Sequence, residues 1–271
     1  MVRRLAGLGV GIAVAVAAFA GTASGASGPR WSPGIPPPGA NDFSCKPPSA
    51  HPDPVVLVHG TFGDLTISWN LIAPALEAGG YCVFALDYGH RGTAPIGRSA
   101  HELERFIDRV RSATGAARVS LVGHSQGGMM PRVYIKFLGG ARRVEDLVGL
   151  APSNHGTRNP AAAIVAPGCP ACAQQEAGSR FLRKLNRRDE TPGPVSYTVV
   201  ETRRDEVVTP FSSAFLDPGP RTTNVLLQRD CPLDLFEHVS IVYDPVALQW
   251  VENALGRRGP ANPAFRPTCI P

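Results

Sequence analysis

Ser125 lies in the pentapeptide Gly-His-Ser-Gln-Gly, between Gly123 and Gly127, and it follows a run of apolar residues. This Gly-x-Ser-x-Gly pattern is typical of a nucleophile elbow, a sharp turn that joins a buried strand to a helix and exposes the serine hydroxyl. The glycines are expected because a side chain at either position would crowd so tight a turn. A serine in this place can attack a carbonyl carbon once a base takes its proton.

Two histidines follow Ser125 in the chain, His155 and His238. Hydrolases with this elbow carry their triad in the order serine, acid, histidine. His238 lies between the last predicted strand and the final predicted helix, whereas His155 directly follows an earlier strand, with no further strand and acid before it. We therefore predict His238 as the general base.

The acid that orients this base should follow the penultimate strand. Residues 196–210 have the pattern of a strand followed by a polar turn, and that turn contains Asp205. We predict that Asp205 accepts the Nδ1 proton of His238 and holds the imidazole in the useful tautomer. Glu201 and Glu206 are close alternatives for this role.

Ester hydrolysis also needs donors for the oxyanion that forms on the attacked carbonyl group. One donor is the N–H of the residue after the nucleophile, and another comes from a loop after an early strand. These rules select Gln126 and the segment 58–62, in which Thr61 is best placed and could add its hydroxyl. A second His-Gly-Thr occurs at 155–157, so the position after the first core strand decides between the two copies.

The elements that must position these residues alternate between strand-like and helix-like segments. Short apolar runs, typical of parallel strands buried on both faces, occur at 55–58, 81–86, 119–122, 147–150, 196–200 and 224–227. Helical patterns are expected at 69–78, 99–115, 126–138, 179–186 and 244–255. The alternation predicts an α/β fold with a mostly parallel central sheet of about six strands and helices on both faces.

Two details concern the helices. Ser99 and Glu102 have the spacing of a capping box, which predicts that the helix over 99–115 begins at Ser99. Pro131 lies about five residues into the helix that starts at Gln126, where it removes a backbone hydrogen bond. This helix should therefore either restart or kink at Pro131.

The N-terminal part of the chain has a different composition. Residues 1–26 have the pattern of a secretory signal peptide, with two arginines before a short apolar run and then small residues. Residues 27–54 are rich in proline and are expected to form an extended arm. We expect residues 55–271 to form one catalytic domain, and we expect the protein to be secreted, extracellular and monomeric, without stable insertion in a membrane.

Six cysteines in an exported chain are expected to form disulfides. Cys169 and Cys172 form a Cys-x-x-Cys without a βαβ context or a second copy, so a local structural disulfide is favoured over a redox or zinc site. The formal charge of +5 is mild and scattered, which argues against nucleic-acid binding. Serine chemistry of this kind requires no metal and no organic cofactor.

Five segments, taken in order, resemble the α/β-hydrolase superfamily, and within it the secreted actinobacterial class 2 lipases and esterases. They are Val-His-Gly-Thr-Phe at 58–62, Gly-His-Ser-Gln-Gly-Gly at 123–128, Ala-Pro-Ser-Asn-His-Gly-Thr at 151–157, Arg-Arg-Asp-Glu-Val-Val-Thr-Pro at 203–210 and Glu-His-Val-Ser-Ile-Val-Tyr-Asp-Pro at 237–245. The pattern is also similar to the fungal B-type lipase of the Candida/Pseudozyma group. The resemblance implies the same site residues, Ser125, Asp205, His238, Thr61 and Gln126, and it suggests the disulfide Cys45–Cys82. The order of the cysteines in the chain then suggests Cys231–Cys269.

The substrate is less closely defined by the sequence than the reaction. An acyl pocket should be apolar, and we expect it to be bordered by Phe62, Met129 and the segment 159–172, including Ile164 and Val165. That segment could equally be a packed connection closed by its two cysteines. The expected function is hydrolysis of lipid esters, most simply as a triacylglycerol lipase at a lipid–water interface. An acyltransferase or a polyester hydrolase would use the same residues, and a non-catalytic binding module on this fold is a further alternative.

Overall fold

The computed structural model describes residues 34–269, and its centre is a sheet of six parallel strands. The strands are β1 (Val55–Val58), β2 (Val83–Leu86), β3 (Val119–His124), β4 (Val144–Leu150), β5 (Ser196–Glu201) and β6 (Thr222–Leu226). Their order in the sheet is β2-β1-β3-β4-β5-β6, and all neighbours are parallel. The predicted α/β fold is therefore confirmed. The predicted signal peptide lies outside the described residues.

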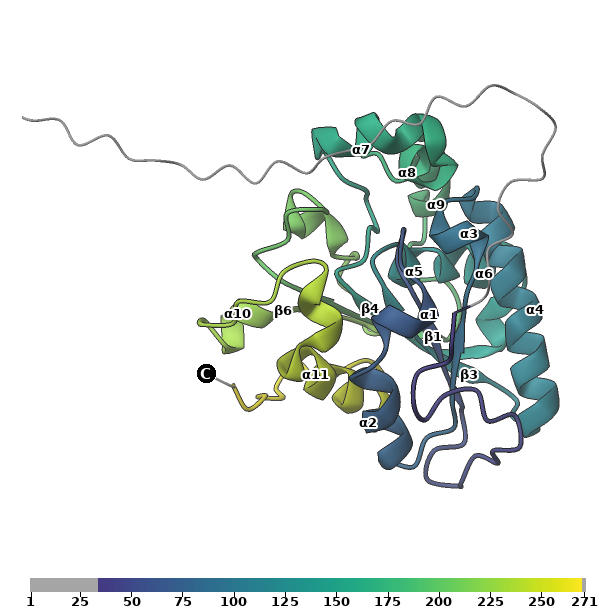
Figure 1. Cartoon of the computed structure of the whole chain (residues 1–271). Coiled ribbons are helices and arrows are strands. Elements are labelled where there is room, and N and C mark those ends of the chain that lie inside the picture. Colours follow the sequence, from purple (N-terminus) through teal and green to yellow (C-terminus); the bar gives the residue numbers. More distant parts are fainter. Residues whose placement is uncertain (1–33, 270–271) are drawn as a thin grey trace, which may run out of the picture. The chain divides into compact units, whose positions relative to one another are not determined.

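Helices pack against both faces of the sheet (Figure 1). One face carries α4 (Ile96–Thr114), α6 (Pro131–Phe137) and α9 (Arg180–Asn186), and the other carries α2 (Ile72–Ala78) and α11 (Pro245–Leu255). The shorter helices are α1 (Leu65–Ser68), α3 (Gly89–Gly92), α5 (Gln126–Met129), α7 (Pro160–Val165), α8 (Pro170–Gln174) and α10 (Leu227–Asp230). Single 3-10 turns are η1 (Gly140–Arg142), η2 (Ala166–Gly168), η3 (Phe211–Ala214) and η4 (Ser240–Tyr243).

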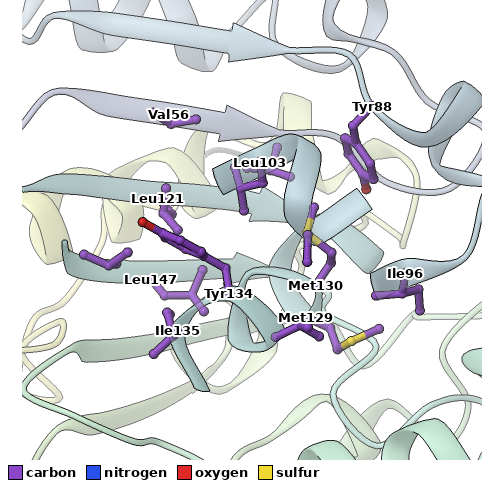
Figure 2. Close-up of a cluster of buried hydrophobic side chains, with 14 of the residues drawn as sticks. Val56, Tyr88, Ile96, Leu103, Leu121, Met129, Met130, Tyr134, Ile135 and Leu147 are labelled. Carbon is purple, nitrogen blue, oxygen red and sulfur yellow. The ribbon is translucent and has the colours of Figure 1, made fainter. Parts of the chain in front are cut away.

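β1 and β2 are apolar at every position because each supplies side chains to two cores. Val56 of β1 packs in the cluster under α4 and α6, whereas its neighbour Leu57 packs in the cluster under α2 and α11. Successive side chains of a strand point to opposite faces, so a strand that is covered on both sides must be apolar at every position. Figure 2 shows Val56, Leu121 and Leu147 in the first of these clusters.

Three disulfides are present, in the pairing that was expected. Cys45–Cys82 ties the N-terminal segment to the residue before β2, and Cys231–Cys269 ties the C-terminal tail to the end of α10. Cys169–Cys172 closes the first turn of α8. Between residues 34 and 54, the chain forms turns and one isolated bridge, from Ala40 to Val83. Within residues 34–269, no helix is long and apolar enough to cross a bilayer.

The prediction that a helix begins at Ser99 is wrong. The helix α4 begins at Ile96, directly after Pro95, and Ser99 is buried inside it. Glu102, the other half of the expected capping box, instead accepts the backbone N–H of Gly89 at 2.8 Å. Pro95 has an extended backbone conformation, with φ −51° and ψ 129°, and the helix begins at the residue that follows it. The position of this proline, and not the capping pattern at Ser99, therefore sets the start of α4.

Pro131 interrupts the helix after the elbow. The first segment, α5, ends at Met129, and α6 restarts with Pro131 at its first position. Met130 between them keeps helical backbone angles, with φ −57° and ψ −37°. Because the first helical residue needs no N–H for the helix, proline is tolerated there. Of the two expected outcomes, the structure has the restart.

Candidate active site

The turn between β3 and α5 holds Ser125 at the carboxyl end of the sheet. Its backbone has φ 54° and ψ −122°, a strained conformation for a residue with a side chain. A Cβ atom at Gly123 would lie 1.9 Å from the carbonyl oxygen of Gly127, and one at Gly127 would lie 1.9 Å from that of Val58. Both clashes are with backbone atoms, which no change of rotamer relieves. The two glycines are therefore a steric condition of the elbow.

The structure brings the three predicted triad residues into contact. Nε2 of His238 lies 3.0 Å from Oγ of Ser125, and Nδ1 of His238 lies 2.7 Å from Oδ2 of Asp205. The other oxygen of Asp205 accepts the backbone N–H groups of Val207 and Val208, at 2.8 and 2.7 Å. With Nδ1–H donated to the carboxylate, Nε2 is the nitrogen that can take the serine proton. All three side chains are buried.

The alternative residues lie elsewhere. His155 bonds through Nε2 to Glu190 at 2.8 Å and through Nδ1 to the backbone of Ser213. Glu206 shares a hydrogen bond with Glu237, and burial followed by this neighbour raises the pKa of Glu206. None of these hydrogen bonds joins His155 or Glu206 to Ser125 or His238.

Glu201, the second alternative acid, touches the site in a different way. It is the last residue of β5, it is wholly buried, and its Oε1 accepts the N–H of Thr202 at 2.7 Å. Burial first, and then the charge of Asp205, raise the pKa of Glu201 well above its usual value. Sequence reasoning missed this effect because burial decides it.

His124, the residue before the nucleophile, supports the base from behind. Its Nε2 donates to the backbone carbonyl oxygen of His238 at 2.8 Å. Burial, and next the neighbouring His238, lower the pKa of His124 to about 3. The ring is therefore neutral at ordinary pH, and one nitrogen keeps its hydrogen for this bond.

Thr61 and Gln126 lie side by side next to the elbow. Oγ1 of Thr61 lies 3.2 Å from Oε1 of Gln126. Gln126 is the first residue of α5, so its N–H has no partner within the helix and can serve another acceptor. The loop that carries Thr61 approaches the serine closely, since a Cβ at Gly60 would lie 3.0 Å from that of Ser125. Gln175, which the sequence did not select, donates to both Thr61 and Gln126.

A cavity of about 510 Å³ opens in front of Ser125 and His238, and its walls are mainly apolar. Phe62 and Val165 line it, as predicted. Further apolar walls come from residues that the sequence did not single out, namely Ile67, Val207, Val208, Val239, Val242 and Tyr243.

Two predicted pocket residues do not line the cavity. Met129 is fully buried in the core under α4 and α6, in the same cluster as Met130 and Ile96 (Figure 2). Ile164 is 80% exposed on α7. One residue advances a helix by about 100°, so Ile164 points outward when Val165 points into the cavity. The segment 159–172 does border the cavity, through Asn159, Ala161, Ala162, Val165 and Cys172.

A comparison with models of protein families shows which family the chain belongs to. Residues 52–251 match the family model described as lipase (class 2). The chain belongs to the class 2 lipase family. Triacylglycerol lipases of Pseudarthrobacter phenanthrenivorans and Burkholderia plantarii are each 35% identical to this class 2 lipase over 86 residues, 29% of its length. These matches span only 27% and 24% of the two relatives.

Solved structures show the fold that this chain shares. Lipase B of Aspergillus fumigatus superimposes with a TM-score of 0.72 at 21% identity, covering 84% of this chain and 57% of that one. The mature lipase BlEst2 of Bacillus licheniformis gives a TM-score of 0.56 at 18% identity, covering 77% and 91%. Together with the six-stranded parallel sheet, these likenesses establish the α/β-hydrolase fold.

Proposed function

We propose that this class 2 lipase is a serine hydrolase that cleaves carboxylic esters of lipids, with triacylglycerol as its most natural substrate. The observation that carries the proposal is the continuous contact from Asp205 through His238 to Oγ of Ser125, beside an apolar cavity. The family match and the two triacylglycerol lipases that resemble part of the chain support the same substrate class.

In the first half of the reaction, Nε2 of His238 takes the proton of Ser125 while Oγ attacks the ester carbonyl carbon. Asp205 stabilises the imidazolium that forms, and the N–H groups of Thr61 and Gln126 receive the oxyanion. When the tetrahedral species collapses, the bond to the alcohol breaks and His238 gives its proton to the alcohol oxygen. The acyl group remains as an ester on Ser125.

Water completes the second half of the reaction. His238 takes a proton from the water, whose oxygen attacks the acyl carbon of the ester on Ser125. The second tetrahedral species collapses with return of the proton to Oγ of Ser125. The carboxylic acid leaves, and the side chains are as they were at the start.

The surroundings of the cavity support a lipid substrate. Several of its lining side chains are also exposed to solvent, so an apolar rim surrounds the entrance: Phe62, Ile67, Val165, Val207, Val239 and Tyr243. Contiguous apolar side chains on a surface indicate contact with an apolar partner. We propose that this rim rests on the lipid phase while the ester enters the cavity.

The proposal also includes the compartment, the domain organisation and the oligomeric state of the protein. The three disulfides suit an oxidising compartment outside the cytoplasm, which agrees with the predicted signal peptide. We propose a secreted enzyme whose residues 55–271 form one catalytic domain. Since one chain supplies the triad, the oxyanion residues and the cavity, we propose that it acts as a monomer.

Hydrolysis of p-nitrophenyl esters from acetate to palmitate, and of emulsified triacylglycerol, tests the proposal. Ser125→Ala should lower kcat at least about 1,000-fold, whereas the control Ser212→Ala, an exposed serine of η3, should be unchanged. Full activity of Ser125→Ala would exclude the mechanism. Activity on short soluble esters alone would leave an esterase in place of a lipase. Product analysis with added alcohol, and with a polyester film, separates the acyltransferase and the polyester hydrolase.

A further inference from the structure

Gln175 links the Cys-x-x-Cys segment to the two oxyanion residues. It follows α8 directly and is buried. Its Nε2 donates to Oε1 of Gln126 at 2.8 Å and to Oγ1 of Thr61 at 3.0 Å, and its Oε1 accepts from Oγ of Ser153 at 2.7 Å. Nε2 also lies 3.2 Å from the carbonyl oxygen of Ala171, the longest of these contacts. The side chain of Gln175 is thus held on both its nitrogen and its oxygen.

Backbone carbonyl groups fix the direction of every bond in this network, because they can only accept. Tyr88 donates its hydroxyl to the carbonyl oxygen of His59 at 2.7 Å, so it must accept from Nε2 of Gln126 at 3.2 Å. Oε1 of Gln126 therefore faces Thr61 and Gln175. Because Oε1 of Gln126 can only accept, Gln175 must present its Nε2, whose two hydrogens serve the two shorter contacts, to Gln126 and Thr61.

This direction decides where the hydroxyl hydrogen of Thr61 can go. Oγ1 of Thr61 already accepts a hydrogen from Gln175, so its own hydrogen is available for donation. Within the described chain, its partner is Oε1 of Gln126 at 3.2 Å, a long contact with an oxygen that Gln175 already serves at 2.8 Å. An oxyanion is a stronger acceptor than this amide oxygen. The hydrogen of Thr61 can therefore turn toward a negative oxygen at little cost.

The disulfide Cys169–Cys172 stabilises the helix that carries Gln175. It closes the first turn of α8, where Sγ of Cys169 also accepts the N–H of Cys172 at 3.1 Å. At the other end of this five-residue helix, the N–H of Gln175 donates to the carbonyl oxygens of Ala171 and Cys172, at 3.0 Å each. A helix so short is marginal by itself, so a covalent closure helps to fix the position of Gln175, the residue that directly follows it.

We propose that Gln175 is a positioning residue of the oxyanion site. It occupies a lone pair of Oγ1 of Thr61 and satisfies Oε1 of Gln126, so that the Thr61 hydroxyl donates to the oxyanion as a third donor beside the two N–H groups. The Cys169–Cys172 disulfide supports this role, because it stabilises α8 and so helps to fix the position of Gln175. This inference rests on the proposed function.

Gln175→Glu is the sharpest test, because it keeps the size of the side chain and removes the donor. An ionised carboxylate at residue 175 would accept the Thr61 hydrogen and draw it away from the oxyanion. We expect kcat for a soluble ester to fall about 10- to 100-fold, with KM changed less than about twofold. The loss should deepen as pH rises and the new carboxyl group ionises, whereas Gln175→Met should lose activity with a pH profile parallel to that of the wild type.

Gln174→Glu is the matched control. Gln174 precedes Gln175 on α8 and uses its Oε1 only to accept the N–H of Ile96 at 2.7 Å, a bond that a carboxylate retains. The same change of charge one residue earlier should leave kcat unchanged. A loss as large as that of Gln175→Glu would show that charge on α8, and not the direction of the Thr61 hydroxyl, is responsible.

A double-mutant cycle with Thr61→Val decides the matter. If Gln175 acts through the Thr61 hydroxyl, Gln175→Met and Gln175→Glu should lower kcat less than about threefold when that hydroxyl is already absent. The inference would be overturned if the loss of kcat in the double variant equalled the product of the losses in the two single variants. Full activity of Gln175→Glu in the wild-type background would also overturn it. A wild type without ester hydrolysis would instead refute the proposed function, so the two failures are distinguishable.

Discussion

Gly127→Ala should destabilise the fold strongly, because there is no room for a methyl group where α5 crosses the end of β1. A Cβ at this position would lie 1.9 Å from the carbonyl oxygen of Val58 and 2.4 Å from that of His59. Both atoms belong to the backbone at the end of a central strand, which pairs on either side with β2 and β3. Relief of the clash requires a shift of α5 or of β1 itself.

The expected loss follows from the atoms involved. Overpacking that side chains can absorb costs about 1–3 kcal/mol, so a clash with two backbone carbonyl groups should cost at least about 3 kcal/mol. A typical domain has about 5–15 kcal/mol of stability, so the variant should fold but unfold far more readily. Ester hydrolysis should fall as well, since Ser125 lies two residues before Gly127.

Gly97→Ala is the matched control for this prediction. Gly97 is exposed on α4, and a Cβ there would meet nothing within 4 Å. Alanine is the better helix former, so this variant should be unchanged or up to about 1 kcal/mol more stable. Urea unfolding followed by circular dichroism measures both. A Gly127→Ala variant within about 1 kcal/mol of the wild type would refute the steric account of the elbow.

Three other perturbations have defined outcomes. Burial raises the pKa of Asp146 from its ordinary value of 3.8 to about 7, so the stability that its proton contributes is lost as pH rises from about 4 through about 7. The free energy of unfolding of Asp146→Asn should therefore rise relative to that of the wild type as pH rises, by up to about 4 kcal/mol at pH 8. Unfolding curves with the same pH dependence for both proteins would contradict this. The Cys231–Cys269 disulfide joins residues 38 apart in the chain. Its removal should lower the free energy of unfolding in urea by about 2–4 kcal/mol. A loss below about 1 kcal/mol would contradict this. Val239→Asp places a charge on the apolar rim, where Val239 is 61% exposed. It should lower hydrolysis of emulsified triacylglycerol about tenfold and that of a soluble butyrate ester less than twofold, and equal losses on both would count against contact of the rim with lipid.

The sheet and the order of the site residues could be predicted from the sequence because local patterns carry both. Strands buried on two faces are mainly apolar, so each of the six contains a short apolar run that was recognisable, with ends displaced by a few residues. The elbow has a five-residue signature, and the order serine, acid, histidine then selects residues at strand ends. Asp205 and His238 were selected in this way and lie in contact with each other.

The remaining features depend on contacts between distant parts of the chain. Gln175 lies 114 residues from Thr61 and 49 from Gln126, and no local pattern relates them. The raised pKa of Glu201 depends on burial beside Asp205. Met129 and Ile164 were both apolar and near the site in sequence, but the direction of a side chain from a short helix is set by how that helix packs.

Covalent labelling of the serine tests the central claim most directly. A p-nitrophenyl alkylphosphonate mimics the tetrahedral species, and mass spectrometry of the digested protein locates the phosphorus. We predict one adduct per chain, on the peptide that contains Ser125, formed in parallel with the loss of ester hydrolysis and slowed at least about 1,000-fold in His238→Ala. An adduct on another residue, or full hydrolysis by protein whose Ser125 is completely labelled, would contradict the mechanism.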